Sequence, residues 1–342
     1  VYSRTTGIWQ TVWVEATSDY SLEHVQVITD IDQRQVVIIP RYYNTLSTNT
    51  LTATISENGK TLAKKSVATV EGMPVVIPFR NFKTWSPEEP NLYDVEYVIR
   101  DKEGNIVDRI KSYLGMRKIH VDGNRIYLNN QPCYQRLGLD QGFYPDGNWT
   151  APSDKALRRD IELSKAVGFN GARLHQKVFE ERFHYWADKL GYLCWGEYAS
   201  WGIDEKSPIA ARNFLPEWGN IIIRDRNHPS IVVWTPFNEV WWPDNVQYPR
   251  LVEDTYKLTH ALDPTRPVNS VSGGVLTPFY DICCMHNYEQ DPAKLKEIIY
   301  NGGKLFNMPS YTKTPTISSG NVPTGDMLDK APLQTTEYDG RR

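Results

Sequence analysis

Two glutamates, Glu239 and Glu337, each end an apolar run of residues that is typical of a β-strand. Cleavage of a glycosidic bond needs two carboxyl groups flanking that bond: an acid for the leaving oxygen, and a nucleophile or base for the anomeric carbon. The two residues are 337 − 239 = 98 positions apart, so they can act together only in a fold that brings distant strand ends to one place. In such a fold, this pair would supply both groups.

The neighbours of the two glutamates suit different roles. An acid that works near neutral pH needs a raised pKa, which apolar surroundings provide. The apolar neighbours of Glu239 are Pro236, Phe237, Val240, Trp241 and Trp242. Glu337 would have to stay ionised as a nucleophile, and a cation such as Arg173 with a hydroxyl such as Tyr288 would hold it so. We therefore predict Glu239 as the proton donor and Glu337 as the nucleophile.

Polar residues stand at the ends of five predicted strands. These ends are Arg173-Leu-His175-Gln176, Trp195-Gly-Glu197-Tyr198, Asn238-Glu239, Met285-His286-Asn287-Tyr288 and Thr335-Thr336-Glu337-Tyr338. In a βα barrel the reactive groups lie at the carboxyl ends of the strands. Any one polar end could be the start of a solvated loop, but five that converge on one face favour a functional site.

Strand-like apolar runs alternate with helical ones after Gly115, which favours parallel βα units. The predicted strands cover 133–139, 169–174, 192–197, 231–237, the region of Val268, 281–285 and 333–337; the predicted helices cover 153–168, 180–190, 214–226 and 249–262. Seven repeats predict a (β/α)8 barrel that is incomplete after its seventh strand. A doubly wound sheet is the alternative, but no glycine-rich phosphate loop follows any strand.

Between Gly7 and Leu114 the apolar residues recur at every second position, as in β-strands with one buried face. Turn pairs such as Asn58-Gly59 and Glu103-Gly104 separate these short strands. The pattern predicts a β-sandwich of immunoglobulin size. Because this stretch has no cluster of His, Cys or carboxylate residues, we expect it to be structural or to shape the substrate site.

Composition limits the classes of partner. The chain has 342 residues, 40% of them apolar and 23% charged, which indicates a globular protein of about two domains. A net charge of −3 gives no electrostatic case for nucleic acid or anionic membranes, and we expect neither as a partner. The 11 Trp, 20 Tyr and 10 Phe suit a carbohydrate cleft, although a large core could need as many. The four Cys show no zinc or disulfide spacing.

At these residues the chain resembles glycoside hydrolase family 2, which includes β-galactosidases, β-glucuronidases and β-mannosidases. The matching segments are Thr5–Glu15, Trp85–Tyr93, Gly115–Arg117 with Ile126–Asn129, Arg224–Ile231 and Pro236–Glu239. The resemblance implies the end of an N-terminal sugar-binding jelly roll over 1–14, an immunoglobulin-like β-sandwich over 15–115 and an incomplete catalytic TIM barrel over 116–342. It also implies a longer native polypeptide than this one.

The resemblance further implies a retaining double displacement, with Glu239 as acid/base and Glu337 as nucleophile. Asn238 would donate to the sugar 2-hydroxyl, Arg173 would orient the nucleophile and Tyr288 would hydrogen-bond it. Other residues that would contact the sugar are His175, His286, Asp140, Trp201, Trp241 and Trp242. For each His the alternative is a supporting hydrogen bond, for each Trp it is wall packing, and for Asp140 it is a solvated loop.

Some departures from the family pattern leave the substrate open. Leu174-His-Gln-Lys177 replaces a Ser-His-Tyr-Pro segment of well-known members, and Tyr198–Gly202 lacks the Glu and His metal ligands of some β-galactosidases. We therefore expect no cofactor and no obligatory metal, and Glu197 could be structural.

A β-galactosidase-like exo-glycosidase is the main hypothesis. The alternatives are a β-glucuronidase, in which Lys177 could bind a carboxylate unless it faces solvent, and an inactive carbohydrate-binding protein. The sequence does not define the cellular compartment or the oligomeric state, and a homo-oligomer is compatible with it.

Overall fold

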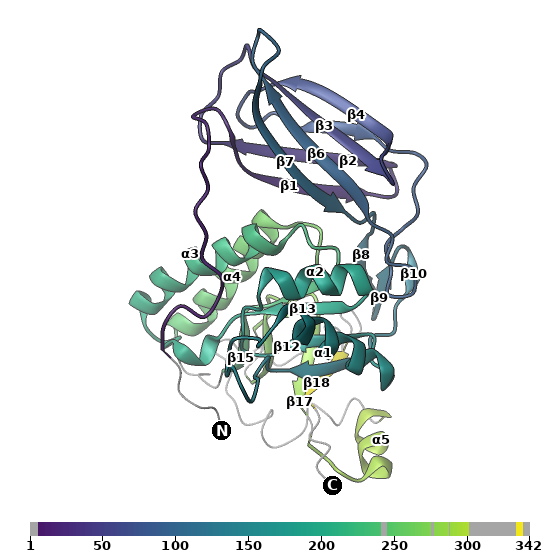
Figure 1. Ribbon diagram of the computed structural model, residues 1–342. Helices are drawn as coiled ribbons and strands as arrows, with labels where there is room; N and C mark the ends of the chain where they lie inside the picture. Colours follow the sequence, from purple (N-terminus) through teal and green to yellow (C-terminus); the bar gives the residue numbers. More distant parts are fainter. Residues whose placement is uncertain (1–5, 241–244, 275–276, 287, 301–332, 338–342) are drawn as a thin grey trace.

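The computed structural model describes residues 6–240, 245–274, 277–286, 288–300 and 333–337. A β-sandwich and a unit of parallel strands with outer helices follow one another along the chain and pack end to end (Figure 1). This order of a sandwich followed by a βα barrel is the one that the periodicity predicted.

The sandwich consists of two antiparallel sheets. One has the order β1 (Leu22–Asp30), β2 (Gln35–Tyr42), β5 (Val75–Pro78), and the other β4 (Lys60–Ala68), β3 (Thr50–Glu57), β6 (Tyr93–Arg100), β7 (Ile106–Leu114). Alternate residues of β3 are buried, as the period of two requires. The predicted turn Asn58-Gly59 joins β3 to β4 with φ angles of 49° and 78°, the left-handed conformation that two-residue hairpin turns need.

A small sheet closes one end of the barrel. It has the order β10 (Gln131–Pro132), β9 (Arg125–Leu128), β8 (Ile119–Asp122). Ile119, Ile126 and Leu128 of this sheet form one buried cluster with barrel residues that include Trp195 and Val233. The amino ends of the barrel strands are thereby covered, which leaves their carboxyl ends for a site.

Parallel strands form the wall of the barrel. The first four are β11 (Leu137–Asp140), β12 (Gly171–Leu174), β13 (Leu193–Glu197) and β14 (Ile231–Thr235), followed by the pairs β15 (Phe237–Val240) with β16 (Val271–Gly274) and β17 (Cys283–His286) with β18 (Leu333–Glu337). Pro236 has no N–H for the ladder and divides the predicted fourth strand into β14 and β15. The predicted fifth strand is displaced: Val268 makes an isolated bridge to Trp234, and β16 begins three residues later.

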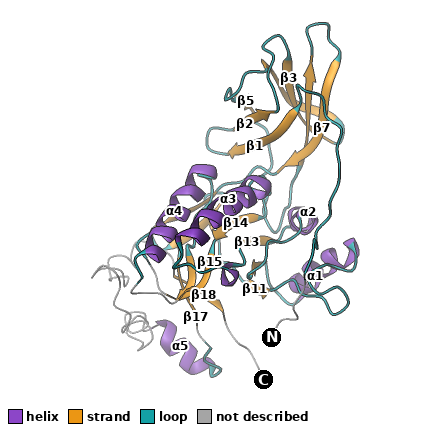
Figure 2. Ribbon diagram, turned by 90° about the vertical axis from the view of Figure 1, so that its left-hand side faces the viewer, coloured by secondary structure: helices purple, strands orange, loops and turns teal. Residues whose placement is uncertain are grey.

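Helices cover the outside of these strands as the pairs α1 (Asp154–Ala166) with α2 (Glu181–Leu190) and α3 (Pro208–Asp225) with α4 (Gln247–Leu262) (Figure 2). Ser153, where the predicted helix begins, caps α1 through its hydroxyl. Helix α3 begins six residues before its predicted start, because Pro208 occupies the first turn, where proline is tolerated. A short 3-10 turn (Ser200–Gly202) and helix α5 (Pro292–Tyr300) were not predicted.

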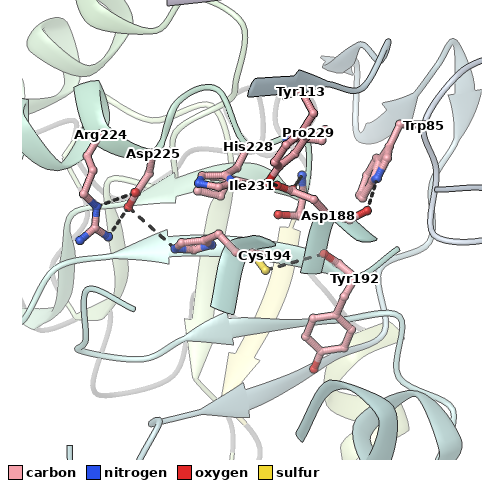
Figure 3. A network of polar contacts seen from close by, with 12 residues as sticks. Trp85, Tyr113, Asp188, Tyr192, Cys194, Arg224, Asp225, His228, Pro229 and Ile231 are labelled. Atoms are coloured by element: carbon pink, nitrogen blue, oxygen red, sulfur yellow. Dashed lines mark hydrogen bonds and ion pairs between the residues drawn. The ribbon is translucent and has the colours of Figure 1, made fainter. Parts of the chain in front are cut away.

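Asp188 joins the sandwich to the barrel (Figure 3). Its buried carboxylate accepts hydrogen bonds from the Tyr113 hydroxyl at 2.7 Å and from the Ser230 N–H at 2.9 Å, and it contacts His228 Nδ1 at 2.6 Å. Its backbone carbonyl accepts the indole N–H of Trp85 at 2.8 Å. Tyr113 lies on β7 and Asp188 on α2, so this carboxylate links the two units.

Charge strengthens this junction. Burial alone would lower the pKa of His228, but the Asp188 carboxylate raises it above its usual value. Burial alone would raise the pKa of Asp188, but His228 and the hydrogen bonds lower it. Nearby His184 behaves differently, because burial lowers its pKa to about 4 and leaves it neutral at pH 7, 3.8 Å from Asp225.

Candidate active site

Polar side chains near the ends of β12, β13, β15 and β17, which the sequence predicted, lie at the carboxyl face of the barrel. Arg173 lies one residue before the end of β12 and Glu197 ends β13, and the two side chains are buried against each other. Arg173 Nε lies 2.7 Å from Glu197 Oε2, and Nη2 lies 3.0 Å from Oε1. The N–H of Gln176 donates to the same Oε1 at 2.9 Å. Glu197 is therefore a counter-ion of Arg173. This contact supports a structural role for Glu197.

Asn238 is oriented by this ion pair. Arg173 Nη2 donates to Asn238 Oδ1 at 2.6 Å, and since a guanidinium only donates, the amide oxygen must face it. The Asn238 backbone donates to Ser200 Oγ at 3.0 Å and accepts from Trp201 Nε1 at 3.0 Å. Asn238 Nδ2 is buried and has no hydrogen-bond partner within the described residues. A held amide with a spare donor is suited to a ligand oxygen.

Glu239 follows on β15 in a left-handed conformation, with φ of 49°. Such a conformation costs a non-glycine residue about 1–3 kcal/mol and is common at functional sites. Its side chain is 21% exposed. One oxygen, Oε1, lies 2.7 Å from His286 Nδ1 and 3.2 Å from the Tyr288 hydroxyl. The carboxyl group is thus held from one side and reachable from another.

Two glycines at the end of β16 allow this arrangement. Gly274 has φ of 78°, and a Cβ there would come within 2.5 Å of the Val240 carbonyl oxygen. Gly273 has φ of 68°, and a Cβ there would come within 2.8 Å of the His286 ring. The preceding residue, Ser272, places its hydroxyl 3.0 Å from His286 Nε2. His286 therefore lies between Ser272 and Glu239.

Glu337 is placed by its backbone. Strands β17 and β18 are parallel, and Glu337 is the ladder partner of His286. The structure does not describe the side chain of Glu337. Trp241 and Trp242 lie outside the described residues. For Tyr288, the hydrogen bond that the structure gives goes to Glu239, and the predicted bond to Glu337 stays a prediction.

The remaining predicted sugar contacts lie around this centre. Trp201 is 58% exposed although its indole N–H is anchored to Asn238, and the buried His175 ring meets it edge to face at 6.3 Å. Asp140 ends β11, where it accepts the Gly142 N–H at 2.8 Å, and burial raises the pKa of its carboxyl group. An exposed indole face is open to a ligand, whereas Asp140 first orders its own loop.

Lys177 does not face solvent. Its buried ammonium donates to the carbonyl oxygens of Gly142 at 2.6 Å and Trp149 at 2.8 Å, and it lies 4.7 Å from the ring centre of Trp9 and 4.9 Å from that of Phe179. Burial lowers the pKa of Lys177 to about 8. Its donors hold the loop after β11, which argues against the free carboxylate reader that the sequence left open.

Sequence reasoning missed Ser200 and Ser272, which orient Asn238 and His286. Serine is too common for either to stand out, although the Ser272-Gly273-Gly274 run at a strand end was a usable signal. The matching segment Arg224–Ile231 serves the domain junction instead: Asn227 pairs with Val25 and Val27, and His228 with Asp188. Within the described residues, no three His, Cys, Asp or Glu side chains are grouped to hold a metal ion, and no helix is long and apolar enough to span a bilayer.

Comparison with known families agrees with this architecture. Residues 20–117 match the family described as Glycosyl hydrolases family 2, and residues 119–320 match the TIM barrel domain of that family. The chain belongs to glycosyl hydrolase family 2. The sequence resemblance and the predicted order of sandwich and TIM barrel are thereby confirmed.

Individual relatives are named for two different activities. A putative beta-glucuronidase of Formosa agariphila is 28% identical over 279 residues, covering 76% of this chain and 33% of that protein. A beta-galactosidase of Enterobacter cloacae is 27% identical over 241 residues, covering 66% of this chain and 22% of that protein. The structure of a beta-D-glucuronidase from Dictyoglomus thermophilum has a TM-score of 0.74 at 18% identity, covering 93% of this chain and 54% of that chain. The chain thus spans between about a fifth and about half of these relatives' lengths.

Proposed function

We propose that this chain carries the catalytic residues of a β-glycosidase that releases terminal β-linked sugars by double displacement, with Glu239 as acid/base and Glu337 as nucleophile. The observation that carries the proposal is the Glu239 carboxyl group at the carboxyl end of β15, which is partly exposed and held through one oxygen by His286 and Tyr288. A residue that must give and take a proton needs this combination of access and fixed orientation.

The proposed reaction has two steps. In the first, the Glu337 carboxylate forms a bond to the anomeric carbon while the glycosidic C–O bond breaks, and the Glu239 proton passes to the leaving oxygen. In the second, water attacks the anomeric carbon, its proton passes to the Glu239 carboxylate, and Glu337 leaves as a carboxylate. Both glutamates return to their starting states, so no other reactant is consumed.

Substrate contacts follow from the same face. Asn238 Nδ2 is the buried donor that would meet the sugar 2-hydroxyl, with Arg173 and Glu197 holding the amide in place. Trp201 would stack on a sugar ring through its exposed face. In this arrangement Arg173 supports Asn238 directly, in addition to the predicted effect on the nucleophile.

For the sugar, a β-galactoside is the first candidate and a β-glucuronide the second. Relatives are named for both activities. Within the described residues, the Lys177 ammonium, which the sequence suggested as a contact for a glucuronate carboxylate, donates to two backbone carbonyl oxygens instead. This contact gives no support to a uronic acid, and the β-galactoside stays the first candidate.

A panel of 4-nitrophenyl β-glycosides, including the galactoside, glucuronide and mannoside, tests the proposal. We expect turnover of one sugar, and loss of nearly all of it in Glu337→Gln without a change in thermal stability. Glu253→Gln is the matched control, because Glu253 is a carboxylate on α4 that pairs with Lys257 at the surface. If no member of the panel were hydrolysed, the proposal that the protein is a glycosidase would be refuted, and the carbohydrate-binding alternative would be favoured.

A further inference from the structure

Three side chains from three strands form one line of hydrogen bonds. Ser272 Oγ on β16 lies 3.0 Å from His286 Nε2 on β17, and His286 Nδ1 lies 2.7 Å from Glu239 Oε1 on β15. Ser272 has no exposed surface and His286 is 9% exposed. Gly273 lets the backbone of β16 pass against the imidazole, since any Cβ there would meet the ring. The ring is therefore fixed on both sides.

The line has the order of hydroxyl, imidazole and carboxylate that hydrolytic triads also have. A nucleophilic serine must reach its substrate, whereas Ser272 is fully buried. Among the contacts of the described residues, the Ser272 hydroxyl therefore acts on the imidazole of His286. Both ring nitrogens of His286 are engaged with protein atoms, as in the supporting role that the sequence analysis gave as the alternative to a sugar contact.

Next to an ionised Glu239, hydrogen-bond chemistry sets the tautomer of a neutral His286. A neutral imidazole carries one N–H and one lone pair, and an ionised carboxylate only accepts. Next to ionised Glu239, Nδ1 of the neutral ring therefore carries the hydrogen. Nε2 then accepts a hydrogen bond from the Ser272 hydroxyl. Together with the Tyr288 hydroxyl, Nδ1–H then gives Glu239 Oε1 two donors.

We propose that Ser272 and His286 are positioning residues that confine the catalytic proton of Glu239 to its other oxygen, Oε2. This inference rests on the proposed function of Glu239 as acid/base. With two donors on Oε1, the proton resides on Oε2 in the acid form and returns there when water is deprotonated. Without the Ser272 hydroxyl, Nε2 loses the donor that favours it as the acceptor, and the imidazole can more readily carry its hydrogen on Nε2 and accept one from Oε1. The acid proton then lies on the oxygen that faces the protein.

The test compares two leaving groups on the sugar that the panel identifies. A phenyl glycoside needs protonation of its leaving oxygen, whereas a 2,4-dinitrophenyl glycoside needs little. We expect Ser272→Ala to lower kcat/KM on the phenyl glycoside ~10-fold or more and on the dinitrophenyl glycoside less than ~2-fold, within the ~10²–10⁴-fold that general acid catalysis contributes. Ser270→Ala is the matched control, because its buried hydroxyl donates to the Phe279 carbonyl and does not touch His286.

A second variant separates tautomer control from packing. In His286→Asn the side-chain amide can donate from the position of Nδ1, and an amide has no tautomers. We expect Ser272→Ala to cause no further loss of kcat/KM on the phenyl glycoside in the His286→Asn background. Equal losses on both leaving groups in Ser272→Ala, or a further tenfold loss in the double variant, would overturn the inference. A failure of the proposed function has a different signature, because the wild type would then hydrolyse neither glycoside.

Discussion

Replacing Tyr113 by Phe removes a single hydroxyl from the junction between the sandwich and the barrel. That hydroxyl donates at 2.7 Å to the Asp188 carboxylate, which is fully buried and ionised beside His228. A hydrogen bond to a buried charged group contributes about 1.5–3 kcal/mol. The ring and its packing stay in place, so we expect Tyr113→Phe to lower the free energy of unfolding by this amount.

Thermal denaturation followed by tryptophan fluorescence measures the effect. At roughly 2–4 °C per kcal/mol for a unit of this size, the expected fall in Tm is ~3–12 °C. Tyr127→Phe is the control, because the Tyr127 ring stacks on His120 while its hydroxyl makes no hydrogen bond with the described part of the chain. If Tyr113→Phe were no less stable than Tyr127→Phe, the bond to Asp188 would not stabilise the junction, and the argument for a charged connection would fail.

Three further predictions concern the barrel. Glu197→Gln removes a carboxylate that is paired with the buried Arg173 guanidinium, so we expect the free energy of unfolding in urea denaturation to fall by about 3–5 kcal/mol; a fall below about 1 kcal/mol would contradict a stabilising buried ion pair. Gly274→Ala should reduce activity on the panel's substrate at least ~10-fold, since its Cβ would come within 2.5 Å of the Val240 carbonyl oxygen and displace Glu239; unchanged kinetics would show that β16 adapts. His184 has a folded pKa of about 4, below its unfolded value of about 6.5, so the unfolded chain binds more protons between these values and stability should rise with pH from 4 to 6.5. His184→Asn should flatten that part of a Tm-versus-pH curve, and an unchanged slope would refute the assignment.

The fold could be predicted because its signals are repeated many times along the chain. Alternating burial in β3 and the Asn58-Gly59 turn each represent a local rule that the structure obeys. Helix α3 was predicted too short because proline favours the first turn of a helix, and Pro216 suits a start at 214, whereas in the structure Pro208 occupies the first turn and Pro216 lies inside the helix. Strand β16 was misplaced because two glycines weaken its strand pattern, although they are what lets it approach Val240 and His286.

Within the candidate site, the sequence identified residue types at strand ends but not their partners. Arg173 was expected to serve the nucleophile, and its contacts with Glu197 and Asn238 depend on which side chains three strands turn inward. Lys177 was expected at a carboxylate or in solvent, because a single lysine gives no sign of a buried position. Such contacts join residues that are distant in sequence, and no local pattern encodes them.

The contacts of the buried Lys177 ammonium have a consequence for local unfolding of the first residues of the chain. Residues 6–14 have no helix or strand, and Ile8 and Val14 are 84% and 96% exposed, yet Trp9 lies over the Lys177 ammonium and its carbonyl accepts the Thr150 hydroxyl. Gln10 donates to Val178 and accepts from Arg224. This segment precedes the sandwich in sequence but is fastened to the barrel. In amide hydrogen exchange this segment should therefore behave as one cooperative unit with the loop between β11 and α1. Replacing Lys177 should increase the exchange rates of the segment and of that loop together.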